Sequence, residues 1–150
     1  MSVEKGAGMP FTTQLRYEHD LLIGMAEALA AGARGDAPPA DLPRLLVLLG
    51  QFTQLLQVHL LREDTVLYPA LAASSDRVAA ALVATLREEH GALERHVAAF
   101  ERDWTADAAR RHWPCFRAEL ADILVMVRDR IERENEDLLP LLDERRDVAA

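Results

Sequence analysis

The stretch from His59 to Pro69, HLLREDTVLYP, decides between a plain helix and a functional site. Its histidine and Glu63 are four residues apart, which places both side chains on one face of a helix. Leu60 and Leu67 lie on or beside this face, so the pair is expected to point into the protein. A buried imidazole and carboxylate need a partner. The spacing alone leaves two interpretations open: a core histidine ion-paired within its own helix, or two metal ligands.

Composition narrows the classes of protein to consider. Half of the 150 residues are hydrophobic and only 5% are aromatic, which favours helix over sheet. The net charge of −8 argues against nucleic acid as a partner, because phosphate binding needs a basic surface. We expect no membrane-spanning run and no signal peptide, and the single cysteine, Cys115, fits a buried position in a reducing compartment. The expectation is a cytoplasmic protein with one domain at 12–145 after a flexible tail at 1–11.

The hydrophobic pattern predicts four helices of about 20 residues, joined by short loops. Thr12 or Thr13 is expected to cap the first helix and Asp41 the second. Pro69 is expected to end or kink the second helix, and Pro140 is expected to close the fourth. This arrangement predicts an all-α, antiparallel, up-down-up-down four-helix bundle.

The second half of the chain repeats the first at an offset of 71 residues. His19 falls on His90 and Glu63 on Glu134, and the prolines at 43 and 69 fall on those at 114 and 140. Shared leucine and alanine content does not readily explain matched histidines, glutamates and prolines at one offset. The repeat predicts two helix hairpins related by an approximate two-fold axis, which would bring matched inward residues together in the bundle centre.

Three histidines and two glutamates from the four helices are therefore expected to converge. Imidazoles and carboxylates in a bundle interior are typical of a non-haem metal site, and they suit iron, manganese or zinc better than calcium or magnesium. Without a cation, two buried carboxylates would repel each other and one would stay protonated. The candidate ligands are His19, His59, Glu63, His90 and Glu134.

These motifs resemble the hemerythrin family in its bacterial HHE cation-binding form, over nearly the whole chain. The family has a histidine on the first helix, His-x-x-x-Glu with a following Pro on the second, Glu-His on the third, and a second His-x-x-x-Glu with Pro on the fourth. The resemblance implies a diiron centre with bridging carboxylates that binds dioxygen or responds to oxygen, nitric oxide, peroxide or iron supply. Some members carry a further histidine where this chain has Glu94, which makes that residue a sixth candidate ligand. The matching segments are Glu18-His19, HLLRE at 59–63 with LYP at 67–69, Glu89-His90, and Glu134 with LLP at 138–140.

Arg130 is where the chain departs from this pattern, because the fourth helix should offer a histidine there. A guanidinium has no free lone pair and cannot ligate a metal. One alternative is a complete diiron site, and the other is a mononuclear or vestigial site in which Arg130 replaces the second metal by pairing with Glu94 or Glu134. Two ferrous ions with two glutamates sum to a positive charge, whereas one ferrous ion, Arg130 and three glutamates are neutral. In a diiron site, one iron would keep His19, His59, Glu63 and Glu134, and the other His90, the bridging carboxylates and Glu94.

Two functions are compatible with these residues. The leading one is a hemerythrin-like non-haem iron protein in oxygen, nitric oxide or redox sensing or in iron handling, with a small diatomic ligand or peroxide as its partner. An iron site with an open position could also decompose peroxide. The alternative is a metal-free helical bundle that binds a protein partner and holds Arg130 in a buried ion network.

Overall fold

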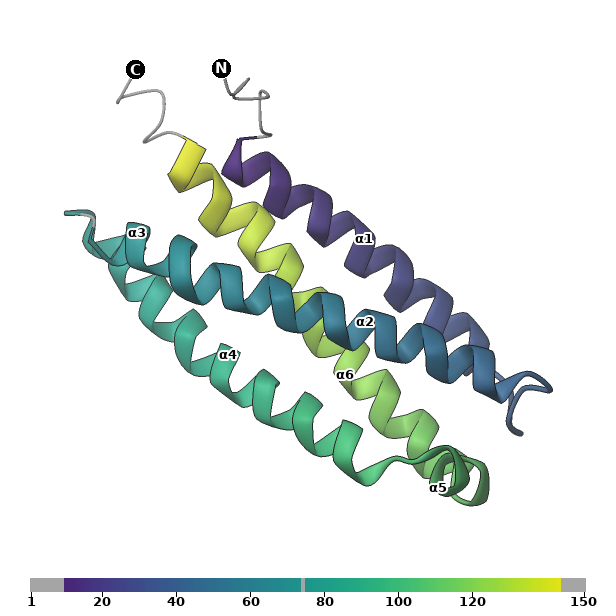
Figure 1. Cartoon of the computed structure of the whole chain (residues 1–150). Coiled ribbons are helices and arrows are strands. Elements are labelled where there is room, and N and C mark those ends of the chain that lie inside the picture. The colour runs from purple at the N-terminus through teal and green to yellow at the C-terminus, as the bar shows by residue number, and fades with distance from the viewer. Residues whose placement is uncertain (1–9, 74, 144–150) are drawn as a thin grey trace, which may run out of the picture.

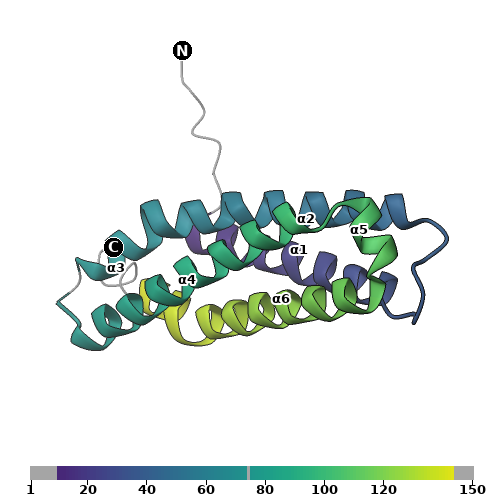
Figure 2. The ribbon, with the colours of Figure 1, turned by 90° about the horizontal axis from the view of Figure 1, so that it is seen from below.

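Four long helices form the body of the molecule, and each runs antiparallel to the next along the chain (Figures 1 and 2). The structure is a computed structural model that describes residues 10–73 and 75–143. Neither of these segments contains a strand, so the predicted all-α bundle is confirmed. The elements are α1 (Phe11–Gly32), α2 (Leu42–Arg62), η1 (Glu63–Leu67), α3 (Tyr68–Ala72), α4 (Arg77–Asp103), α5 (Ala106–Arg111), α6 (Trp113–Arg133) and η2 (Glu134–Leu138).

The structure confirms the predicted N-terminal cap of α2 but not that of α1. A side-chain oxygen of Asp41 accepts the backbone N–H of Arg44 at 3.1 Å, so the predicted cap of α2 is confirmed. The predicted threonine cap of α1 is wrong, because α1 begins at Phe11 after Pro10, and Thr12 is buried within its first turn. The predicted tail at 1–11 lies outside the described residues except for these last two positions.

Neither proline in the second half of a long helix stops it. Each follows a π-helical turn, η1 before Pro69 and η2 before Pro140, in which a backbone N–H bonds five residues back: Tyr68 to Glu63, and Leu139 to Glu134. A proline breaks an α-helix because its ring clashes with the carbonyl four residues earlier and it donates no hydrogen bond. In the wider π-helical turn before each proline, the hydrogen bonds reach five residues back instead of four, so the carbonyl nearest the proline is displaced from its α-helical position. The fourth helix therefore continues through residues 139–143, and the prediction that Pro140 closes it is wrong.

Cys115 is also placed differently from the expectation. It lies exposed in the first turn of α6, whereas the next residue, Phe116, is buried. Neighbouring residues of a helix point in directions about 100° apart, so only one of the two can face the core. The connection before α6, for which the sequence predicts a loop, contains the short helix α5.

The continuous helix Leu42–Ala72 spans 31 residues and contains an 18-residue window with a mean hydropathy of 1.2, so by length and composition alone it could cross a membrane. The expectation that no run has this property is therefore wrong. In the bundle, this helix packs against α1 and α4 and contains the buried polar residues His59 and Glu63. Such a helix is also typical of a bundle core, so its hydropathy by itself is weak support for a membrane span.

Two apolar clusters lie on either side of a polar layer in the bundle interior. One contains Leu22, Leu60, Leu93 and Ile131, and the other contains Leu15, Leu67, Leu86 and Leu138. Each long helix supplies apolar residues to both clusters, and a buried polar residue lies between these two sets of apolar residues in its sequence. The apolar residues thus fix the height of the polar layer in the bundle. These polar residues are His19, Glu63, His90 and Glu134.

Candidate metal centre

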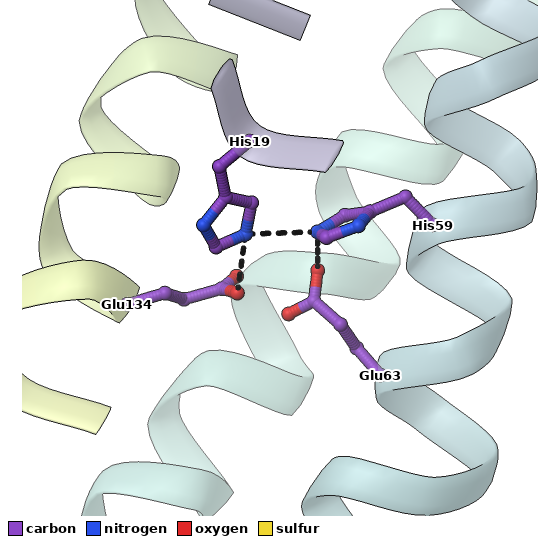
Figure 3. A group of neighbouring side chains, drawn as sticks. All are labelled: His19, His59, Glu63 and Glu134. Atoms are coloured by element: carbon purple, nitrogen blue, oxygen red, sulfur yellow. Dashed lines mark hydrogen bonds and ion pairs between the residues drawn. The ribbon is translucent and has the colours of Figure 1, made fainter. Parts of the chain in front are cut away.

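Four of the predicted ligands meet in the polar layer (Figure 3). His19 comes from α1 and His59 from the last turn of α2, while Glu63 and Glu134 open the π-helical turns η1 and η2. One ligand atom from each residue lies within 4.8 Å of those of the other three. All four side chains are buried, so the group is closed to bulk water.

The inward nitrogen and oxygen atoms of this group lie within short distances of one another. Nε2 of His19 lies 3.0 Å from Nε2 of His59, and the latter lies 2.8 Å from Oε1 of Glu63. Nε2 of His19 lies 3.5 Å from Oε2 of Glu134. Two imidazole nitrogens and two carboxylate oxygens therefore surround one small volume (Figure 3).

The outward nitrogens of both rings are held by oxygen acceptors. Nδ1 of His59 donates to Oε1 of Glu18 at 2.9 Å, and Glu18 also accepts from Arg62. Nδ1 of His19 donates to Oδ1 of Asn135 at 2.7 Å. A neutral imidazole that donates from Nδ1 has a lone pair at Nε2. Contacts of this kind orient histidine ligands in metal sites.

The donor set fits a metal cation. Within the described residues, Oε1 of Glu63 and Oε2 of Glu134 have no hydrogen-bond donor, although both are buried. With both histidine lone pairs also directed inward, four acceptor atoms face one another. Buried acceptors in such an arrangement require either a shared proton or a cation. Imidazole nitrogen with carboxylate oxygen is a ligand set for a transition metal such as iron, manganese or zinc.

The carboxyl groups of Glu63 and Glu134 have very different pKa values in the metal-free protein. Burial and the neighbouring Glu134 raise the pKa of Glu63 to about 8. Burial also opposes ionisation of Glu134, but the adjacent Glu63 and His19 and the positive charge of Arg130 lower its pKa to about 2. One carboxyl is thus protonated and the other ionised at neutral pH, which is the behaviour expected of two buried carboxylates without a cation.

Arg130 lies on the other side of the carboxylates and is 6% exposed. Its Nε donates to Oε1 of Glu134 at 3.0 Å, and Nη2 donates to the hydroxyl of Tyr68 and to the carbonyl of Leu86 at 2.8 Å. The Tyr68 hydroxyl donates to Oε2 of Glu63 at 3.2 Å. Burial disfavours the charged guanidinium, but Tyr68 and the two glutamates outweigh this effect and raise its pKa. Arg130 is therefore a permanent cation beside the group of four ligands.

The other two predicted ligands, His90 and Glu94, are not part of this group. His90 is buried, and its Nε2 lies 3.2 Å from Oε1 of Glu94, whose side chain is 56% exposed. Asn135 and Tyr68 also contact the centre: the sequence gives Tyr68 only as a possible hydrogen-bond donor near a ligand, with packing favoured, and it does not indicate Asn135. Asn135 directly follows a predicted ligand, which is the one signal that could have identified it.

Fold and site together define a four-helix bundle with a candidate cation centre in its core. Residues 10–142 match the family described as Hemerythrin HHE cation binding domain. The chain therefore belongs to the hemerythrin HHE cation-binding family, as its motifs indicate. No curated protein and no solved structure gave a match to the chain.

Proposed function

We propose that the protein binds iron through His19, His59, Glu63 and Glu134, and that it acts in oxygen, nitric oxide or redox sensing or in iron handling. The observation that carries this proposal is the convergence of two buried imidazole nitrogens with two buried carboxylate oxygens that have no donor among the described residues. Membership of a cation-binding family supports it. The single cysteine supports a role in the cytoplasm.

The surroundings of the centre favour a very small ligand. His19, Glu63 and Glu134 are completely buried and His59 is nearly so, which excludes an organic substrate unless the helices separate. Iron held by these four residues would supply the chemistry for binding dioxygen, nitric oxide or peroxide. The protein's own part is to hold both imidazoles through Glu18 and Asn135 and to exclude water with the two apolar clusters.

Elemental analysis of protein purified from iron-supplemented cells tests the proposal. We expect iron in the wild type and a loss of at least about tenfold in metal affinity in His59→Ala, because this change removes a ligand. The matched control is His96→Ala, since His96 is exposed on α4 and should bind normally. Fully helical protein without metal would contradict the proposal and favour a metal-free bundle that binds a protein partner.

A further inference from the structure

The two halves of the chain support the centre differently. In the first half, buried Glu18 accepts a hydrogen bond from Nδ1 of His59. At the offset of 71 residues, the counterpart of His59 is Arg130, and the counterpart of Glu18 is Glu89. Glu89 lies at the surface, where it pairs with Arg133. The contact that orients a ligand in the first half therefore has no counterpart in the second.

His90 shows a second difference of the same kind. Its counterpart, His19, is held by Asn135 at 2.7 Å. The counterpart of Asn135 is Asp64, which is exposed, and Nδ1 of His90 has no hydrogen-bond partner in the described part of the chain. Nε2 of His90 faces Glu94 at the surface instead of the inward carboxylate oxygens. His90 is therefore not oriented as a ligand for an ion between the glutamates.

The carboxylate oxygens that a second ion would need are already bonded. Oε1 of Glu134 accepts from Arg130 at 3.0 Å, and Oε2 of Glu63 accepts from Tyr68 at 3.2 Å. The guanidinium is fixed in turn by Tyr68 and by the carbonyl of Leu86. The two remaining oxygens, Oε1 of Glu63 and Oε2 of Glu134, are the ones directed at the histidines and left without a donor among the residues described.

We infer that the centre binds a single metal ion, and that Arg130, with Tyr68, occupies the place of a second one. This inference rests on the proposed function, because it assumes that His19, His59, Glu63 and Glu134 bind metal. It assigns to Arg130 the role of a built-in cation that limits the number of metals. Arg130 is not a ligand, since a guanidinium has no free lone pair.

Charge supports the same conclusion. Two carboxylates, Arg130 and one divalent ion leave a single net positive charge in the polar layer. A second divalent ion would add two further positive charges to a layer whose other carboxylate, Glu18, is already paired with Arg62. Uncompensated charge in a buried site is strongly unfavourable. A second ion would thus have to bind against both repulsion and the existing hydrogen bonds of Arg130.

The number of metal ions per chain tests the inference directly. We expect wild-type protein loaded with ferrous iron under anaerobic conditions, and freed of excess iron, to hold one ion. His90→Gln should leave this number and the affinity unchanged, because His90 belongs to the second position only. Two ions in the wild type, or a loss of iron in His90→Gln, would overturn the inference while leaving the proposed function intact. No iron in the wild type would overturn the proposed function itself.

Arg130→His tests whether the guanidinium is the limiting feature. Removing the cation and supplying an imidazole should raise the content from one ion to two, with magnetic coupling between them visible by Mössbauer spectroscopy. Arg133→His is the matched control: it makes the same change three residues away at a partly exposed position and should still bind one ion. A folded Arg130→His protein that still binds one ion would show that Arg130 is not what limits the site. Should Arg130→His fail to fold, the iron content of the wild type and of His90→Gln still tests whether the centre holds one ion.

Discussion

At the scale of single residues, the centre is defined as much by its supporting contacts as by its ligands. The histidines could be predicted because the repeat pairs His19 with His90, and helical spacing joins His59 to Glu63. The contacts of Arg130 with Tyr68 and the Leu86 carbonyl could not, because they link residues 62 and 44 positions apart. Such contacts depend on how the helices are rotated against one another, which spacing within one helix does not determine.

Glu18 should be important for metal affinity although it is not a ligand. Glu18→Ala removes the acceptor that holds His59 and should weaken ferrous iron binding by about 10- to 100-fold. The measurement is competition with a chromophoric chelator. Glu89→Ala is the control, since Glu89 holds the equivalent position at the surface. Equal effects of the two substitutions would contradict the supporting role of Glu18.

Tyr68 should contribute to stability through its hydroxyl. Tyr68→Phe removes the donor to Glu63 and an acceptor of Arg130, and leaving such buried groups unpaired should lower the free energy of unfolding by about 1 to 3 kcal/mol. Urea unfolding of the metal-free protein measures this change. Tyr17 is half-exposed, so Tyr17→Phe should have almost no effect. A Tyr68→Phe protein as stable as the wild type would exclude the hydrogen-bond network from any structural role.

At the scale of elements, the π-helical turns are the main departure from the sequence-based picture. Glu63 and Glu134 each open such a turn, so the repeat seen in the sequence is also a repeat of backbone geometry. The sequence signal there was a proline, which predicts a kink or an end. Residue propensities do not distinguish a π-turn from an α-turn, so the continuation of both helices past proline could not be predicted. Turns of this type are common at functional sites.

The cap of α2 provides a prediction at the same scale. Asp41→Ala removes the acceptor for the backbone N–H of Arg44 and should reduce the free energy of unfolding by about 1 kcal/mol. Asp36→Ala in the preceding connection should change it by less than about 0.5 kcal/mol, because the ion pair of Asp36 with Arg117 is exposed. Denaturant titration of the two variants separates these outcomes. An Asp41→Ala protein as stable as the wild type would mean that the cap does not stabilise the helix start.

At the scale of the whole molecule, the fold was predictable because several signals agree. Helical periodicity, matched prolines and the offset of 71 residues all predict the same bundle, and the buried side chains follow that pattern. The two apolar clusters enclose the polar layer from both sides, so metal-free protein should remain folded. What the sequence left open was the number of metals, because this depends on where the Arg130 side chain lies.

Metal binding should stabilise the entire bundle, because the ligands come from α1, α2, η1 and η2 together. A metal present at about 100 times its dissociation constant adds about 2.7 kcal/mol. For a chain of this size, that should raise the melting temperature by about 5 to 10 °C. Calorimetry with and without ferrous iron measures the shift, and His59→Ala should show little of it. Identical melting curves for wild-type protein shown to contain iron would contradict a site that links the helices.

Anomalous diffraction at the iron absorption edge, from crystals of iron-loaded protein, would show how many metal ions the centre holds and where they lie. We expect one peak per chain, within about 2.0 to 2.3 Å of Nε2 of His19 and His59 and of the inward oxygens of Glu63 and Glu134. Arg130 should remain bonded to Glu134 beside it. A peak elsewhere, no peak, or a second peak between Glu134 and His90 would contradict a single metal ion bound by these four residues.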